Sequence, residues 1–546
     1  MTWSLPVDLI GDASNLHVSA TILSGSQGCG RHLALKARPK VAAAGWSPFK
    51  GKQRPFPLGD LVYLIKEAHA APAEALGPSA IAGWLQQQFD ALNVHRLLRP
   101  FLAHAVENVL DAHDSIEGEL GPLRLLMHDP RIGPPGKQLS AWGPVYAREQ
   151  DVREVRRYRL GRAHVVPTEG DLRWGVTAAH VAALRGSSPA RIRAVEVGAA
   201  DGSISVLFDD TPEAAQAAFQ ALGMPRLRHV IEQTDAEPGW DCASCKIAGT
   251  CDSLLPVTGM LGQRGPGIAF RSVTPRELHE YRQCSAQWFL AREAKLPRDT
   301  EFTEPQARGR AVHLWLRAAH ERGTACRGDD LPEPGNDLGL AEGIISSQEY
   351  AAAYPYLLQH LKDCPLDVPG TMVVGVKKAI HGIDHDAQVV VVTTPDLALL
   401  RDGELILREV RTAAAVPEHG RDEAYSRDLQ IPFLLRMLAC GLMAHHEVAT
   451  GRVELELLTP DGAELWSWDG DHPMTAQVAA GDVRRAVEVW HRDETWASRP
   501  GPHCTWCPVR QWCPDADSEG PGVSLDNSGV DLESLAGMAI DELPPF

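Results

Sequence analysis

The stretch Val389–Ala413 has the sequence VVVVTTPDLALLRDGELILREVRTA, and its pattern decides the expected fold. Val389–Thr393 is a β-branched run, Leu397–Leu400 is apolar, and Glu404–Val410 alternates loosely between polar and apolar residues. Asp402-Gly403 separates the last two segments, and Asp-Gly is a preferred two-residue hairpin turn. The stretch therefore predicts a β-hairpin.

Two carboxylates, Asp396 and Glu409, fall on adjacent strands of this expected hairpin. Carboxylates a few ångströms apart repel each other unless a cation lies between them, and their hard oxygen atoms suit magnesium or manganese. The hairpin therefore predicts a divalent-metal site. Asp384 is an alternative first carboxylate, but the Pro-Asp step and the spacing to Glu409 favour Asp396.

Pro395-Asp396, followed after twelve residues by Glu409-x-Arg411, resembles the signature of the PD-(D/E)XK nucleases. The resemblance implies an α/β fold of the restriction-endonuclease type, in which helices flank a central mixed sheet. In that family a Gly-x3-His helix places its histidine against the metal, and Gly309 and His313 match this motif. Arg411 departs from the family, which has a lysine at this position.

The resemblance also implies the members of the active site. The implied catalytic residues are Asp396, Glu409, Arg411 and Gln430. The implied ligands of Mg²⁺ or Mn²⁺ are His313, Asp396, Glu409 and the carbonyl group of Val410. Arginine donates hydrogen bonds and carries charge but stays protonated, so Arg411 weakens the case for turnover.

Two classes of function stay open at this point. The first is a metal-dependent deoxyribonuclease, by family habit an exonuclease on single-stranded DNA or DNA ends, in repair, recombination or defence. The second is a catalytically inactive pseudonuclease that binds DNA and recruits partners.

Eleven cysteines include two triplets with the same C-x2-C-x5-C spacing, each preceded far upstream by a lone cysteine. The first quartet is Cys29, Cys242, Cys245 and Cys251, and the second is Cys284, Cys504, Cys507 and Cys513. Four thiolates suit either a tetrahedral zinc ion or an iron–sulfur cluster. The three other cysteines, Cys326, Cys364 and Cys440, lack such spacing and are expected to be ordinary thiols.

This order of cysteines resembles the iron–sulfur nucleases of the RecB superfamily, which include AddB and the CRISPR adaptation nucleases. The resemblance implies a [4Fe–4S] cluster at one or both quartets, with zinc as the alternative. Such a cluster would staple the two ends of each nuclease domain together.

The repeat continues between the cysteines, because Arg153-Glu154-Val155-Arg156 matches Arg408-Glu409-Val410-Arg411 letter for letter. Glu154 follows Cys29 by the same number of residues as Glu409 follows Cys284. We therefore predict two tandem domains of one fold, residues 1–257 and 268–515, joined by a linker at 258–267. The first domain is expected to be degenerate, since Tyr63 and Ala141 stand where the second has His313 and Asp396.

The composition limits the partners of the chain. A net charge of −18 over 546 residues gives no global attraction to nucleic acid, so any DNA site must be a local basic patch. Five arginines in Val152–Arg162 are one candidate for phosphate contact, and a solvated surface is the alternative. The absence of a long apolar run or an amino-terminal signal pattern predicts no membrane span and a cytoplasmic location.

The carboxyl-terminal stretch, residues 516–546, contains no basic residue and is expected to be a disordered acidic tail. Its end, residues 540–546, is similar to the tails of bacterial single-stranded-DNA-binding proteins. We hypothesise that it recruits a protein partner.

Overall fold

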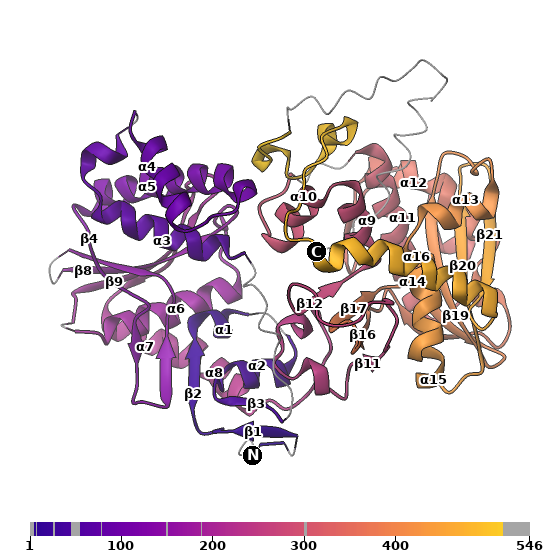
Figure 1. Cartoon of the computed structure of the whole chain (residues 1–546), viewed down its shortest axis with the longest axis horizontal. Coiled ribbons are helices and arrows are strands. Elements are labelled where there is room, and N and C mark those ends of the chain that lie inside the picture. Colours follow the sequence, from indigo (N-terminus) through magenta and orange to yellow (C-terminus); the bar gives the residue numbers. More distant parts are fainter. Residues whose placement is uncertain are drawn as a thin grey trace. The chain divides into compact units, whose positions relative to one another are not determined.

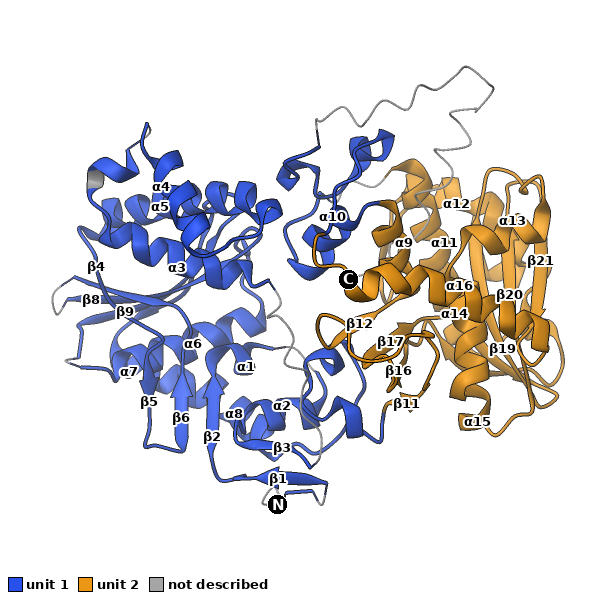
Figure 2. Ribbon diagram, viewed as in Figure 1, with its two compact units in different colours: residues 1–253, 284–299, 496–520 blue, residues 254–283, 300–495, 521–546 orange. Residues whose placement is uncertain are grey.

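The structure is a computed structural model that describes residues 5–6, 8–25, 28–44, 55–77, 79–148, 151–186, 188–299 and 303–516. The chain is of the α/β class and divides into two compact units (Figures 1 and 2). Unit 1 holds the residues up to 253, Cys284–Asp299 and the segment that begins at Trp496, whereas unit 2 holds Leu254–Gln283 and residues 300–495. Among the described helices, none is both long and apolar enough to cross a membrane.

Unit 2 is built on a five-stranded mixed sheet with the order β15-β18-β19-β20-β21. Its central pair, β19 and β20, is parallel, and the flanking pairs are antiparallel. The strands are β15 (Met372–Val376), β18 (Leu397–Arg401), β19 (Glu404–Thr412), β20 (Thr450–Leu458) and β21 (Ala463–Asp469). This sheet confirms the predicted α/β class.

The predicted hairpin is present as β18 and β19, with Arg401 paired to Glu404. The two turn residues, Asp402 and Gly403, both have positive φ, 51° and 80°, which is the type I′ geometry that the Asp-Gly pair favours. The preceding run, β17 (Val389–Thr393), belongs to a different sheet with the order β11-β16-β17-β12. Its other strands are β11 (Leu255–Pro256), β16 (Ile380–Asp384) and β12 (Arg271–Val273). The Thr-Pro step after it ends that strand, because proline has no N–H to donate.

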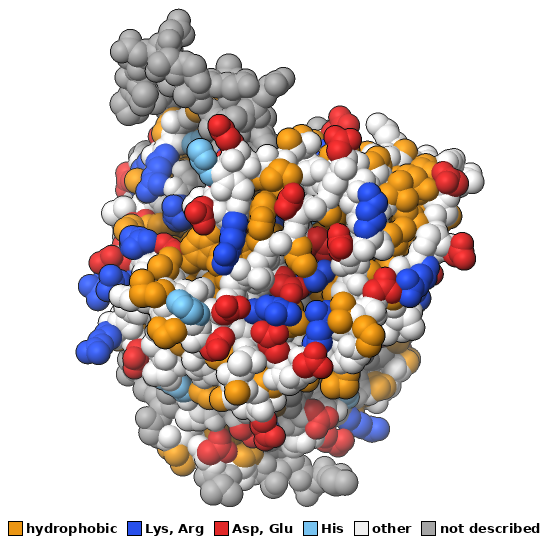
Figure 3. Space-filling model, turned by 90° about the vertical axis from the view of Figure 1, so that its right-hand side faces the viewer, with side chains coloured by type: hydrophobic (Ala, Val, Ile, Leu, Met, Phe, Trp, Pro, Cys, Tyr) orange, Lys and Arg blue, Asp and Glu red, His pale blue; other side chains and the backbone are white. Residues whose placement is uncertain are grey.

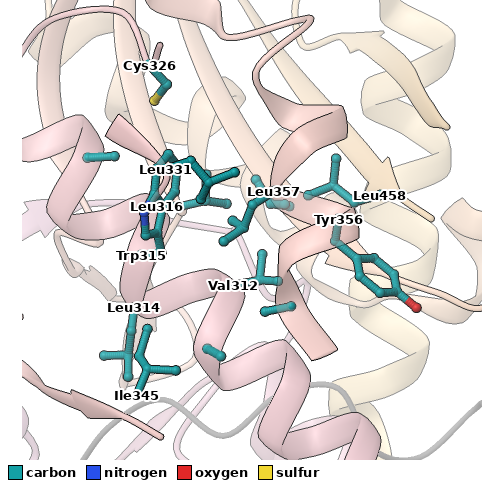
Figure 4. Close-up of a cluster of buried hydrophobic side chains, with 14 of the residues drawn as sticks. Val312, Leu314, Trp315, Leu316, Cys326, Leu331, Ile345, Tyr356, Leu357 and Leu458 are labelled. Atoms are coloured by element: carbon teal, nitrogen blue, oxygen red, sulfur yellow. The ribbon is translucent and has the colours of Figure 1, made fainter. Parts of the chain in front are cut away.

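Helices pack against the sheet of unit 2 and against one another. They include α9 (Pro275–Gln283), α11 (Glu304–Glu321), α12 (Ser347–His360), α14 (Gln430–Met437) and α16 (Pro473–Arg492). Helix α9 begins as its sequence predicts: the Glu277 N–H donates to Thr274 Oγ1 at 3.1 Å, and the Thr274 N–H donates to Glu277 Oε2 at 2.9 Å. An apolar cluster between α11, α12 and β20 includes Trp315, Leu357 and Leu458 (Figure 4).

Unit 1 contains a sheet with the same plan, in the order β10-β9-β8-β7-β4. The strands are β4 (Arg124–His128), β7 (Pro144–Arg148), β8 (Val152–Arg159), β9 (Arg191–Gly198) and β10 (Ile204–Asp210). The pair β8 and β9 is parallel and the others are antiparallel, as for β19 and β20. The register also shifts within the β4–β7 pair, as it does between β15 and β18.

Helices of unit 1 include α3 (Pro57–Ala70), α5 (Arg99–Leu120) and α6 (Glu169–Ala183). Helix α6 lies against the sheet, where Trp174 packs with Val155 and Ile192 in an apolar cluster.

The compact units do not follow the domain boundaries that the sequence predicts. The second cysteine quartet lies in unit 1, although its residues flank the predicted second domain. The segment 258–267, expected as a linker, is held within unit 2, where Gly259 and Leu261 donate backbone N–H groups to Asp384. Residues 517–546, which include the proposed recruiting end, lie outside the described residues.

Candidate active site

The hairpin register brings the two predicted carboxylates together. Leu397 pairs with Arg408, so Asp396 and Glu409 are the next residues along the two strands. Both are buried, with 6% and 2% of their surface exposed. The Val410 N–H donates to Asp396 Oδ2 at 2.7 Å, which fixes the orientation of this carboxylate.

Asp396 also faces two side chains from other elements. His313 Nδ1, from the middle of α11, lies 3.2 Å from Asp396 Oδ1, and the Lys377 ammonium contacts the same oxygen. Burial by itself would raise the pKa of Asp396, but Lys377, His313 and Arg411 outweigh it and hold this pKa well below its usual range. The Asp396 side chain is therefore a carboxylate.

Arg411 places one guanidinium nitrogen among the predicted metal ligands. Its Nη1 lies 3.1 Å from Glu409 Oε2, 2.9 Å from the Val410 carbonyl oxygen and 3.8 Å from Asp396 Oδ2. Three oxygen donors thus converge on one cationic position. Hard oxygen atoms in such an arrangement are suitable ligands for Mg²⁺ or Mn²⁺, so the donor set fits the divalent ion that the hairpin predicts.

The opposite side of the Arg411 guanidinium is anchored outside this position. Its Nε and Nη2 donate to Asp428 Oδ2 at 3.1 and 2.8 Å. Gln430, the first residue of α14, donates its Nε2 to Glu409 Oε1 at 2.9 Å. The structure therefore brings His313, Asp396, Glu409, the Val410 carbonyl, Arg411 and Gln430 to one place.

Asp384 has a different position and a different role. It is fully buried, and it accepts backbone N–H groups from Gly259, Leu261, Asp386 and Ala387. Both oxygens of this carboxylate accept hydrogen bonds from backbone N–H groups of the segments 259–261 and 386–387, so they are not available as metal ligands. The alternative assignment of the first metal carboxylate to Asp384 has no support in this geometry.

Sequence reasoning missed Lys377 as a member of the site. It follows β15, has a left-handed φ of 45°, and donates its backbone N–H to the Asp396 carbonyl at 3.0 Å. Non-glycine residues rarely adopt positive φ, and such residues cluster at functional sites. The only signal in the sequence is the Lys377-Lys378 pair before a strand, which says nothing about a neighbour nineteen residues later.

In unit 1 the equivalent position is filled differently. Tyr146 pairs with Glu154, so a tyrosine, and not Ala141 as predicted, lies where unit 2 has Asp396. The Tyr146 hydroxyl lies 2.9 Å from His69 Nε2, and Arg156 donates to Glu154 Oε1 at 2.5 Å and to His113 Nδ1 at 2.8 Å. Tyr146 supplies no carboxylate, so Glu154 is left without the partner that Asp396 gives Glu409, and Arg156 already neutralises it.

The arginine-rich strand β8 is neither a solvated surface nor a phosphate-binding patch. Arg153 and Arg156 are 5% and 1% exposed, and Arg157 and Arg159 each lie 2.9 Å from Glu196 on the neighbouring strand β9. Within β8 both expectations fail for local reasons. Arg153 donates to the carbonyl groups of Ala182 and Arg185, Arg156 pairs with Glu154, and the parallel strand β9 brings Glu196 beside Arg157 and Arg159. Arg162, which follows the strand, is exposed.

The imidazoles near Arg156 predict acid sensitivity of unit 1. Burial and the Arg156 charge lower the pKa of His69 to about 4 and that of His113 to about 3. Between about pH 6.5 and 4 the unfolded chain therefore binds protons that the folded unit does not, so stability is present above pH 6.5 and falls on acidification.

We expect amide protection in α3 and α5 to decrease between pH 7 and pH 5, and to decrease less in His69→Gln. Hydrogen exchange with mass spectrometry on the full chain measures this. Equal losses in the wild type and the variant would contradict the assignment to His69.

Each cysteine quartet gathers in space. Burial, with a further contribution from the neighbouring thiols of its quartet, raises the pKa of Cys245 to about 12, and the same causes act on Cys507. The triplets share short 3-10 turns, with Cys245 and Cys507 donating backbone N–H groups to the carbonyls of Cys242 and Cys504. Thiols this close do not ionise together unless a cation compensates their charge. Among the described residues, however, neither quartet brings three sulfur atoms within 4.8 Å of one another.

Comparison with known proteins agrees with the fold. Residues 272–514 match the model of the PD-(D/E)XK nuclease superfamily. This match covers less than half of the chain, and it contains the whole of the hairpin site.

Two solved structures are similar to part of the chain. One is a candidate exonuclease from Eubacterium rectale, 10% identical, with 40% of this chain and 80% of that chain covered and a TM-score of 0.27. The other is the protein SSO0001, 11% identical, with 43% and 86% covered and a TM-score of 0.19. Comparison with curated protein sequences gives no match.

Proposed function

We propose that the hairpin site of unit 2 hydrolyses phosphodiester bonds of DNA with the help of a divalent metal ion. The observation that carries this proposal is the convergence of Asp396, Glu409 and the Val410 carbonyl on one cationic position beside His313. Two buried carboxylates this close together need a compensating cation.

In this proposal the residues of the site have separate roles. His313, Asp396, Glu409 and the Val410 carbonyl would hold Mg²⁺ or Mn²⁺, which polarises a phosphate and lowers the pKa of a bound water. Gln430 orients Glu409 through its 2.9 Å hydrogen bond. Lys377 supplies a flexible ammonium group at Asp396, and we assign to it the charge that the lysine of the superfamily signature provides.

Arg411 gives specific support to a second candidate function. Its guanidinium holds the cationic position through three oxygens and is anchored by Asp428, so the carboxylates are neutralised without any ion. A site that keeps this arrangement would bind DNA or partners without cleaving. For catalysis, Nη1 must leave Glu409 and the Val410 carbonyl while Nε and Nη2 stay on Asp428.

Each cysteine quartet is proposed to hold a [4Fe–4S] cluster, as in the RecB-like nucleases. Sulfur atoms around one zinc ion lie about 3.8 Å apart. Among the described residues, the groups with three or more donor atoms within 4.8 Å of one another include neither quartet. The absence of a single-zinc arrangement is compatible with a larger cluster, and free thiols in such numbers suit the reducing cytoplasm.

A duplication of one nuclease domain is part of the proposal. The shared strand order, the shared parallel central pair and the matching Arg-Glu-Val-Arg tetrapeptides on β8 and β19 support it. Unit 1 would then have lost its metal site through Tyr146 and would serve structure or binding.

DNA is the proposed substrate, with ends or single strands as the preferred form, and repair, recombination or defence as its setting. On the face that Figure 3 shows, acidic and basic side chains are interspersed, which agrees with the net charge of −18. Phosphate contacts are therefore expected to be local to the hairpin site. Recruitment of a partner through residues 540–546 stays a prediction.

Arg411→Lys distinguishes the two candidate functions. Hydrogen bonds to charged groups contribute about 1.5–3 kcal/mol, so removing the competing guanidinium should speed cleavage about tenfold to a hundredfold. The half-maximal Mn²⁺ concentration should decrease as well. Degradation of end-labelled single- and double-stranded DNA by the full chain, with Mg²⁺ or Mn²⁺, measures both effects.

Arg485→Lys is the matched control, because Arg485 lies on α16 with 69% of its side chain exposed and pairs only with Asp482 in the described structure. Cleavage by the wild type, faster for Arg411→Lys and unchanged for Arg485→Lys, would support the nuclease. DNA binding without cleavage by all three forms would overturn it in favour of the second candidate.

A further inference from the structure

Four metal-binding side chains meet in the core of unit 2, away from the hairpin site. His320 lies in the last turn of α11, and Cys326 lies in the loop that follows. His360 is the last residue of α12, and Cys364 comes four residues later. All four are buried, at most 3% exposed, and their donor atoms lie within 4.8 Å of one another.

The distances within this His/Cys cluster approach those around a tetrahedral ion. His320 Nε2 lies 3.2 Å from His360 Nε2 and 4.0 Å from Cys364 Sγ. Ligands at about 2.0–2.1 Å for nitrogen and about 2.3 Å for sulfur lie about 3.3–3.8 Å apart around a tetrahedral zinc ion. Two nitrogen and two sulfur donors are also a typical structural zinc set.

The orientation of His360 suits a metal ligand. Its Nδ1 lies 2.7 Å from Glu456 Oε1, which places the proton on Nδ1 and directs the lone pair of Nε2 into the cluster. Glu456 is itself buried and lies 3.4 Å from Arg408 Nη1. A carboxylate that orients a histidine in this way is the usual outer partner of a zinc ligand.

The surroundings of the cluster are apolar. Cys326 and Cys364 belong to the core cluster with Trp315, Leu316 and Leu331, part of which Figure 4 shows. Zn²⁺ would displace one proton from each thiol and bind two neutral imidazoles, so the complete centre would carry no net charge. A neutral centre is the form that an apolar core tolerates.

We propose that His320, Cys326, His360 and Cys364 bind one structural zinc ion. All four positions around the ion are then filled by protein, which leaves none for a substrate and makes the site structural rather than catalytic. In this proposal Cys326 and Cys364 are metal ligands and not the ordinary thiols that the sequence predicts. It goes beyond the proposed nuclease activity and does not depend on it.

The zinc site would hold the helix that carries His313. It joins the carboxyl-terminal ends of α11 and α12, and through Glu456 it reaches β20, where Glu456 pairs with Val410 of the hairpin. His313 lies two turns before His320 on α11, about 10 Å along its axis, so the two histidines serve separate sites.

A second group of metal-binding residues in the described structure does not compete with this assignment. His164, Asp171 and Glu196 also approach one another in unit 1. Arg157 and Arg159 already pair with both of these carboxylates, so the group is neutralised without a metal.

The test is the metal content and zinc coordination of the full chain, purified without chelators. We expect one zinc per chain that is lost in Cys364→Ser, with iron unchanged, and that is retained in Cys440→Ser. Zinc-edge X-ray absorption of the wild type should show two sulfur ligands at about 2.3 Å and two nitrogen ligands at about 2.0–2.1 Å. Glu456→Gln should weaken zinc binding about tenfold to a hundredfold.

The wild-type X-ray absorption spectrum tests the proposal even if the Cys364→Ser variant fails to fold. Zinc with four sulfur ligands would assign the metal to the cysteine quartets and overturn the proposal. Absence of zinc, or a Cys326–Cys364 disulfide found by mass spectrometry of unreduced protein, would overturn it too.

Discussion

Asp396→Asn is expected to lower metal-dependent DNA cleavage by roughly a thousandfold or more. A catalytic metal ion contributes several kcal/mol to stabilisation of the transition state, and each 1.4 kcal/mol, in round numbers, is about a factor of ten. Asparagine keeps an oxygen to accept the Val410 N–H but removes the charge that faces His313 and Lys377. His313 and Lys377 would then face a neutral amide, and the divalent metal ion would lose one negatively charged ligand.

The measurement is the initial rate of end-labelled DNA degradation with saturating Mn²⁺, compared with the unfolding temperature of the same protein. Asp402→Asn is the matched control, because it makes the same chemical change on the same hairpin. Asp402 is exposed and has positive φ, and asparagine favours that turn position as much as aspartate does. Cleavage by Asp396→Asn at the wild-type rate would mean that the activity does not arise at this hairpin.

Cys507→Ser is expected to remove the cluster of the second quartet and to destabilise the fold. The quartet connects Cys284 with a segment more than two hundred residues later in the sequence. A cross-link that closes so long a loop stabilises the folded state. By analogy, loss of the cluster should lower the free energy of unfolding by on the order of 4 kcal/mol or more. Burial and the neighbouring thiols raise the pKa of Cys507 to about 12, although its side chain is partly exposed.

Iron content, visible absorption and thermal unfolding of anaerobically purified protein measure this effect. We expect part of the iron and absorption to disappear and the unfolding temperature to fall, with Cys440→Ser unchanged in all three. Cys440 lies outside both quartets and outside the His/Cys cluster. Full iron content and an unchanged unfolding temperature in Cys507→Ser would contradict a cluster at this quartet.

Local patterns in the sequence predicted the central hairpin correctly. Alternation of apolar residues and the Asp-Gly turn depend on neighbours within a few positions, and they encode the register that aligns Asp396 with Glu409. The helix that carries His313 was implied by the Gly-x3-His motif of the family resemblance, and α11 is present there. The Thr274 cap, similarly local, is present as expected.

Other features could not be predicted because they depend on how distant elements pack. Tyr146 takes the position assigned to Ala141, since the register of β7 against β8 is set by sheet pairing and not by counting along the chain. Arg157 and Arg159 of β8 pair with Glu196 because β9 brings this carboxylate beside them. Composition alone suggested a charged surface there.

The sequence by itself therefore determined the hairpin, its two carboxylates, the residue that replaces the superfamily lysine, and the cysteine spacing. Only the tertiary structure decided that the Arg411 guanidinium occupies the cationic position, that Lys377 reaches Asp396, and that two helix ends form a His/Cys cluster. The physical reason is the range of the interactions. Turns and alternation act between neighbours in the chain, whereas these contacts form only when helices pack on a completed sheet.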